Sequence, residues 1–213
     1  MIQEYIQRLA ITAPPIIISL TVHECAHAWA ALYMGDPTAK MLGRLTLNPL
    51  KHLDPIGTIM LFFSGLFGWA KPVPVNPRNF RDYKRGEIIV SAAGPVSNLA
   101  LAVACAVLLK IMAAFEPMAA AAAPWLFTPL YLMTQFGVII NVAMAVFNMV
   151  PIPPLDGSHI LAVLLPPASA RAFARIRPYG FMILLLFIAT DTFSKIFAPV
   201  IYLLAGTLLG GSL

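Results

Sequence analysis

The first long apolar run of the chain, Leu9 to Met34, contains the sequence His23-Glu24-Cys25-Ala26-His27. The run is long enough to cross a bilayer as a helix, and Gly35-Asp36-Pro37 should end that helix. Residues four apart in a helix share a face, so both imidazoles should point the same way. Two histidines at this spacing can bind one zinc ion, and the adjacent glutamate can act as a general base.

The place of this pattern matters more than the pattern itself. The His-Glu-x-x-His pattern fixes only three positions, and it occurs by chance in the helices of soluble proteins. Inside an apolar run, however, two histidines and a glutamate cost several kcal/mol to bury unless they have partners or a task. Ionisable groups at membrane depth are usually functional. The setting therefore favours a catalytic or metal-binding role.

The composition excludes a soluble globular domain. Of the 213 residues, 60% are hydrophobic and 11% are charged, and the mean hydropathy is +0.83. Soluble domains carry about 25% charged residues. The net charge of +5 lies in loops between apolar runs and forms no single patch, so it does not predict nucleic-acid binding. It is better explained by the positive-inside rule for membrane proteins.

Two further runs are long enough to span, Ile88 to Leu109 and about Pro129 to Val150, and neither carries a charge. The alanine-rich stretch from Lys110 to Trp125 between them is expected to be a loop on the non-cytoplasmic side. The tail from Pro178 to Leu213 fits either one long tilted helix or two short ones. We therefore predict an all-α polytopic membrane protein, a single domain over residues 1–213, with a bundle of about four to six transmembrane helices.

A shorter apolar run, Ile56 to Ala70, falls below the length that a bilayer requires. Basic loops flank it on both sides, so we predict a re-entrant or interfacial segment. Before it, Leu45-Thr46-Leu47 alternates weakly and is a candidate short strand near the active site. After it, three prolines in Lys71 to Pro77 exclude a helix and predict extended chain. Such a chain could run beside another extended peptide, although a plain structured loop is the commoner case.

The positive-inside rule orients the chain. Two regions hold eleven of the fourteen basic residues, the stretch from Thr38 to Glu87 with eight and the stretch from Arg171 to Arg177 with three. Both should face the cytoplasm, which requires an even number of crossings between them. The two long runs supply two crossings, provided that Ile56–Ala70 does not cross. The site should then open toward the cytoplasm.

A catalytic zinc site needs a third protein ligand from another segment. The candidates are His52, Asp54, Asp156 and His159. Asp156 ranks first because it follows prolines that break a helix within apolar sequence, and broken backbone at membrane depth lines a cavity or is buried. His159 is a distant second. The structural alternative for Asp156 is a carboxylate that caps the next helix, and the two roles are compatible.

Three stretches together resemble the site-2 protease family of intramembrane zinc metalloproteases. They are the histidine pattern, Gly94-Pro95-Val96-Ser97-Asn98, and Asn148-Met149-Val150-Pro151-Ile152-Pro153-Pro154-Leu155-Asp156-Gly157. Their order and spacing match, and the resemblance covers about Leu9 to Leu165. The chain resembles the minimal members that lack a PDZ or CBS domain. The resemblance implies multi-pass membrane insertion, with a bacterial cell membrane expected.

The resemblance also implies roles for particular residues. His23, His27 and Asp156 would bind one Zn²⁺ per chain, and Glu24 would be the general base for hydrolysis of transmembrane protein substrates. Asn148 would lie near the active site. We expect four residues to contact the substrate: Asn98, Asn148, Val73 and Val75.

A non-enzymatic zinc transporter or metal-stabilised scaffold is the alternative, since it would use the same ligands without needing Glu24. Oligomeric state and substrate identity stay open. We expect no nucleic-acid partner, and we expect the protein to be embedded in the lipid bilayer.

Overall fold

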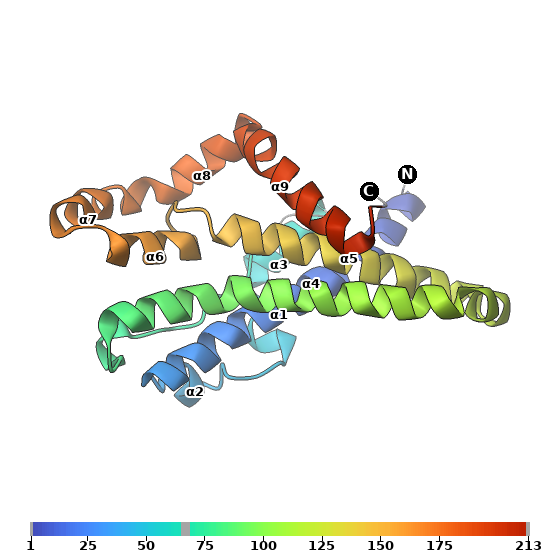
Figure 1. Ribbon diagram of the computed structural model, residues 1–213, viewed down its shortest axis with the longest axis horizontal. Helices are drawn as coiled ribbons and strands as arrows, with labels where there is room; N and C mark the ends of the chain where they lie inside the picture. Colours follow the sequence, from blue (N-terminus) through green and yellow to red (C-terminus); the bar gives the residue numbers. More distant parts are fainter. Residues whose placement is uncertain (1, 65–68, 212–213) are drawn as a thin grey trace.

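The apolar runs form helices in the computed structural model, which describes residues 2–64 and 69–211 (Figure 1). No β-strand occurs in these two ranges, apart from an isolated bridge between Leu53 and Ala70. The helices are α1 (Ile2–Met34), α2 (Thr38–Met41), α3 (Pro55–Ser64), α4 (Tyr83–Ala122), α5 (Pro124–Asn148), α6 (Asp156–Leu164), α7 (Pro167–Ala174), α8 (Gly180–Ala189) and α9 (Thr192–Leu209). Single 3₁₀ turns lie at Pro49–Lys51, Pro77–Asn79 and Arg177–Tyr179.

The body of the molecule is built from α1, α4 and α5, which lie side by side, with α9 against α5 (Figure 1). Small side chains mark the close contacts. Ala30 and Ala31 of α1 pack with Val90 of α4, and Ala102, Val142 and Ala205 join α4, α5 and α9. Without a hydrophobic driving force in lipid, helices associate through such small residues because their backbones can approach closely.

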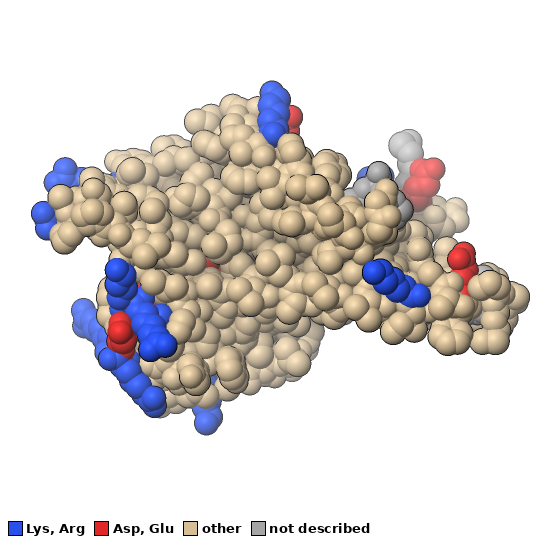
Figure 2. All heavy atoms as spheres, in the orientation of Figure 1, with Lys and Arg blue, Asp and Glu red and all other residues tan. Residues whose placement is uncertain are grey.

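Four segments in the described part of the chain are long and apolar enough to cross a membrane, which confirms the predicted all-α polytopic protein. They comprise residues 2–34, 83–118, 124–148 and 167–189. The tail forms two helices, α8 and α9, with Asp191 between them in the left-handed region at φ 56°. Figure 2 shows a largely uncharged surface, with Lys and Arg gathered at the end where α4 begins and where α7 lies.

Two local expectations were wrong. Leu45–Leu47 forms bends and not a strand. The Thr46 carbonyl oxygen bonds to the His52 ring at 2.8 Å, so it pairs with a side chain and not with a neighbouring strand. The stretch from Lys110 to Trp125 is mostly helix, since α4 continues to Ala122. Alanine has the highest helix propensity, so an alanine-rich sequence extends a helix once it has begun.

The predicted re-entrant segment Ile56–Ala70 includes residues 65–68, which lie outside the described ranges, so re-entry stays a prediction. Its helix α3 has ten residues, about 15 Å at 1.5 Å each, roughly half of the hydrocarbon thickness. The two ends meet: Leu53 and Ala70 form the bridge, and the Lys71 amide donates to the His52 carbonyl oxygen at 2.7 Å. The two described ends of the segment therefore lie next to each other.

Candidate metal centre

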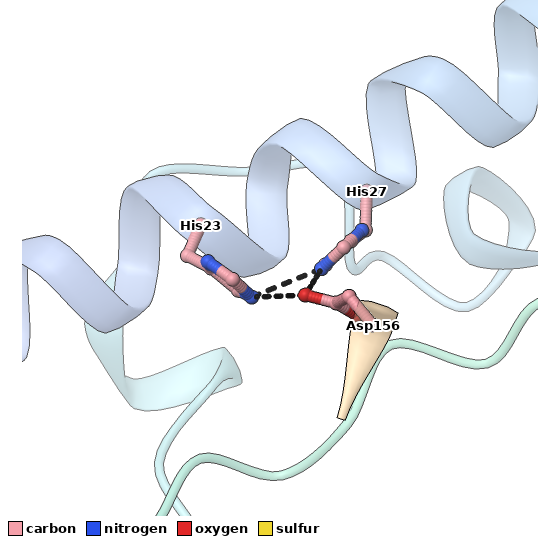
Figure 3. A group of neighbouring side chains, drawn as sticks. All are labelled: His23, His27 and Asp156. Carbon is pink, nitrogen blue, oxygen red and sulfur yellow. Dashed lines mark hydrogen bonds and ion pairs between the residues drawn. The ribbon is translucent and has the colours of Figure 1, made fainter. Parts of the chain in front are cut away.

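Two histidines of α1 and one carboxylate of α6 point toward one another (Figure 3). The Nε2 atoms of His23 and His27 are 3.0 Å apart. Oδ2 of Asp156 lies 3.3 Å from the first and 3.4 Å from the second. Helical spacing brings the two rings to one face, as the sequence predicted. The contact with Asp156, 129 residues beyond His27, is a product of the tertiary fold.

Each histidine ring is held by its other nitrogen. His23 Nδ1 lies 2.6 Å from Asn98 Oδ1, and His27 Nδ1 lies 2.8 Å from the carbonyl oxygen of Val90. Both partners on α4 are acceptors, so both Nδ1 atoms carry the proton; the tautomers follow from this network. A neutral ring protonated at Nδ1 leaves an Nε2 lone pair free for a metal.

The donor set fits a zinc ion. Two Nε2 lone pairs and a carboxylate oxygen face one another, and Asp156 Oδ2 is buried without a hydrogen-bond partner among the described residues. Such a convergence is repulsive unless a cation or proton lies between the atoms. Two histidines and one carboxylate are a donor set of catalytic zinc sites, which keep a fourth position open.

Gly94 of α4 provides the space beside these atoms. A Cβ at this position would lie 2.4 Å from His27 Nε2 and 2.6 Å from His23 Nε2, where real Cβ contacts essentially never fall. In the sequence, Gly94 stood out as the first residue of the Gly94–Asn98 stretch. The structure shows a specific reason for this glycine: any side chain here would fill the space that the two imidazoles face.

The proline-rich turn after α5 delivers Asp156. Helix α5 ends at Asn148, and α6 begins at Asp156 with Leu155 in the cap position, so the alternative role of Asp156 as a cap is not observed. Gly157 packs so closely under this turn that a Cβ would lie 2.2 Å from the Met149 carbonyl oxygen. The chain can therefore double back and direct the carboxylate toward α1.

Glu24 lies in the same cavity as the three converging residues, a space of about 790 Å³. Its Oε2 accepts a hydrogen bond of 2.8 Å from the Val73 amide. The extended chain from Lys71 to Pro77 thus runs along α1 next to the candidate base. Val73 and Val75 both line the cavity, and Val75 also packs on the cluster around Ala31.

A buried carboxylate anchors this extended chain at its far end. Asp36, fully buried just after α1, accepts hydrogen bonds from the amide of Asn76 at 2.7 Å and from Asn79 Nδ2 at 2.7 Å. It also accepts from the amide and hydroxyl of Thr38. Burial alone would raise the pKa of Asp36, but these hydrogen bonds to the charged form outweigh it and lower the pKa below its ordinary value.

The two asparagines expected at the substrate differ in position. Asn148 lines the cavity, with its Nδ2 bonded to the Met144 carbonyl oxygen at 3.0 Å. Asn98 has an exposed fraction of 0% and does not line the cavity. Its side chain is engaged by His23, Ser19 and Asn141, so the expected substrate contact of Asn98 is not what the structure shows.

The other candidate ligands do not belong to the converging group, although Asp54 and His159 line the same cavity. His52 bonds to the Thr46 carbonyl oxygen, Asp54 Oδ1 accepts from the Gly57 amide at the start of α3, and His159 pairs with Glu87 at 3.4 Å. The sequence reasoning missed Asn141. The signal was available, since an amide side chain in a charge-free span needs a partner.

Comparison with known proteins gives one family match and several relatives. Residues 110–189 match Peptidase family M50. A Bacillus subtilis protein provisionally named zinc metalloprotease YwhC is 43% identical over 188 residues, covering 87% of this chain and 83% of the relative. Proteins provisionally named zinc metalloprotease Rip2, from Mycolicibacterium smegmatis and Mycobacterium tuberculosis, are each 32% identical and cover 87% of this chain and 69% of their own length. No solved structure matches.

Proposed function

The chain belongs to the site-2 protease family, peptidase family M50, and from this premise we propose that it cleaves transmembrane protein substrates within or near the bilayer. As a member, it is an integral membrane zinc metalloprotease whose cofactor is Zn²⁺. The proposal concerns the finer points: which residues hold the metal, which residue moves the proton, and how the substrate is presented.

The proposed ligands are His23, His27 and Asp156. The observation that carries this assignment is the convergence of their three lone-pair atoms within 4.8 Å of one another. Both rings are supported through Nδ1 by acceptors on α4, which is the arrangement that metal-binding histidines usually have. The chemistry that zinc supplies in such a site is Lewis acidity, which acidifies water and polarises a carbonyl group.

Glu24 is the proposed general base. It follows His23 directly and shares the cavity, so its carboxylate can take a proton from the attacking water and return it to the leaving amine. The Val73 amide holds Oε2 at 2.8 Å. That hydrogen bond restricts the carboxylate to one orientation and leaves its other oxygen for proton transfer.

The extended chain at Val73 and Val75 is the proposed docking edge. A helical substrate hides its own carbonyl groups, so it must unwind locally, and pairing with an extended edge would hold it open. Three backbone amides of this extended chain, those of Lys71, Val73 and Asn76, already donate hydrogen bonds within the protein and hold the chain in place. Asn148, across the cavity, has one amide N–H beyond its bond to Met144 with which to approach a substrate carbonyl.

The cavity is proposed to open toward the cytoplasm. The basic residues before α4 and around α7 gather at one end of the molecule (Figure 2), and the positive-inside rule assigns such an end to the cytoplasmic face. The described ends of the segment around α3 lie next to each other, which supports a segment that does not add a crossing.

The Glu24→Gln variant tests the proposed base. Purified in detergent, it should bind zinc as tightly as the wild type but fail to cleave a membrane-embedded substrate. A His27→Ala variant is the matched comparison, since it should lose both zinc and cleavage. Intact cleavage by Glu24→Gln would overturn the assignment.

The docking edge is tested separately by placing proline at Val75. This substitution removes the Val75 amide donor while leaving the Val73 amide on Glu24. Cleavage of a transmembrane substrate should fall and zinc content should not change. Unchanged turnover would refute the docking role of this residue. Val75→Ala, which keeps the amide, is the control for the lost side chain.

A further inference from the structure

Helix α5 buries an asparagine, Asn141, in a sequence without charged residues. Its exposed fraction is 1%, and it does not line the cavity that contains the candidate metal centre. A buried amide in a membrane span is costly unless its donors and acceptor are engaged. The proposed reaction uses no group at this position. Asn141 therefore needs a different explanation.

Its hydrogen bonds lead to the metal centre in two steps. Asn141 Oδ1 accepts from Asn98 Nδ2 at 2.8 Å, and Asn98 Oδ1 lies 2.6 Å from His23 Nδ1. At the other end, Asn141 Nδ2 donates to the Gly137 carbonyl oxygen at 2.8 Å. These contacts join α5, α4 and α1 through buried atoms. We call this series the amide relay.

Each step of the amide relay determines the next. The Gly137 carbonyl can only accept, so it faces the Nδ2 of Asn141 and turns the amide oxygen toward Asn98. That oxygen, together with the Ser19 carbonyl oxygen at 3.3 Å, faces the Nδ2 of Asn98. Asn98 must then present its oxygen to His23, so the proton of His23 resides on Nδ1.

The reverse orientation would harm metal binding. If the Asn98 amide rotated by half a turn, its NH₂ group would face His23 Nδ1 and favour the tautomer protonated at Nε2. That tautomer has no lone pair where Asp156 and His27 converge. The rotated Asn98 would also direct its amide oxygen at two acceptors, Asn141 Oδ1 and the Ser19 carbonyl oxygen.

We propose that Asn141 is a positioning residue that fixes the Nδ1–H tautomer of His23 through Asn98 and so keeps His23 Nε2 available for zinc. The proposal rests on the assignment of His23 as a ligand. It places a determinant of metal affinity on α5, two hydrogen bonds away from the ligand that it controls.

The Asn141→Leu variant tests the amide relay because leucine has a similar volume and no hydrogen-bonding group. Groups that support metal-ligating histidines contribute about 10- to 100-fold to metal affinity. Since Asn141 acts through Asn98 and the Ser19 carbonyl remains, we expect zinc affinity, measured by chelator competition, to fall about tenfold. In the metal-free variant, ¹⁵N NMR of the His23 ring should show a larger Nε2–H population than in the wild type.

Asn148→Leu is the matched control. It lies on the same helix, and its Nδ2 makes the same kind of bond to a carbonyl four residues back. Among the described residues its side chain makes no hydrogen bond to either histidine, so zinc affinity and the His23 tautomer should both stay at wild-type values. A merely structural cost of losing an asparagine from α5 would affect both variants alike.

Wild-type zinc affinity together with an unchanged His23 tautomer in Asn141→Leu would overturn the proposal. If that variant does not fold, Asn141→Ser takes its place. Its hydroxyl can bond to the Gly137 carbonyl, as Ser19 does to Pro15, but it lacks the amide oxygen that Asn98 faces. The ligand assignment on which this proposal rests is tested separately. If His23 is not a ligand, His23→Ala will keep its zinc, while the NMR measurement will still report on the amide relay.

Discussion

Replacing Gly94 with alanine is the sharpest test of where the metal binds. The added methyl carbon would lie 2.4 Å from His27 Nε2 and 2.6 Å from His23 Nε2, whereas ordinary contact begins at 3.4 Å. The two nitrogens would have to withdraw by 1.0 Å and 0.8 Å (3.4 − 2.4 and 3.4 − 2.6). Zinc–imidazole bonds are about 2.0–2.1 Å long, and displacements of this size break them.

We expect Gly94→Ala to lower zinc affinity by at least about 100-fold, which corresponds to about 2.8 kcal/mol at 1.4 kcal/mol per tenfold change. The metal-free protein should remain folded, because alanine is favoured over glycine in a helix by about 0.8–1.0 kcal/mol. Chelator competition gives the affinity, and thermal unfolding in detergent with excess chelator gives the stability of the metal-free state.

Gly137→Ala is the matched control on α5. Its added methyl would meet the Cys105 sulfur at 3.1 Å, a contact that a small side-chain rotation relieves, so zinc affinity should hold. Full zinc content and cleavage in Gly94→Ala would refute the reasoning. The added methyl leaves no room for an ion between these two nitrogens, so the zinc would have to be bound elsewhere.

Three further outcomes follow from the structure. Removing zinc with a strong chelator should abolish cleavage, and adding zinc back should restore it, with activity following metal content in a titration. Asp36→Ala should lower the free energy of unfolding by about 3 kcal/mol, because it removes a buried carboxylate that accepts hydrogen bonds from Thr38, Asn76 and Asn79, and chemical denaturation in detergent would measure this. The lowered pKa of Asp36 also predicts a pH dependence: its stabilisation is present above the unfolded value of 3.8 and is lost as the pH falls through the lower folded value. Proteolysis of the Asn76–Asn79 turn should therefore accelerate below pH 3.8 in the wild type and show no such step in Asp36→Ala.

The sequence could predict the parts of this protein that depend on local geometry. Helical spacing places His23 and His27 on one face wherever the helix lies, because the turn of a helix is set by its own backbone. Length and hydropathy identified the spans, and the prolines before Asp156 marked a break that leads into a cavity. One prediction was wrong although a local cue was present: the alanine-rich sequence after Lys110 favours a helix, and α4 continues to Ala122.

Only the tertiary structure decided what lies around the histidines. Asn98 was expected at the substrate, but the close approach of α1, α4 and α5 buries it between His23 and Asn141. The same approach leaves no room for a side chain at position 94, because a Cβ there would collide with both histidine rings. Side-chain roles of this kind depend on distances between helices, which arise only when the packed faces meet. The pattern at His23–His27 was thus a property of one helix, whereas the candidate metal centre depends on how α1, α4 and α6 pack together.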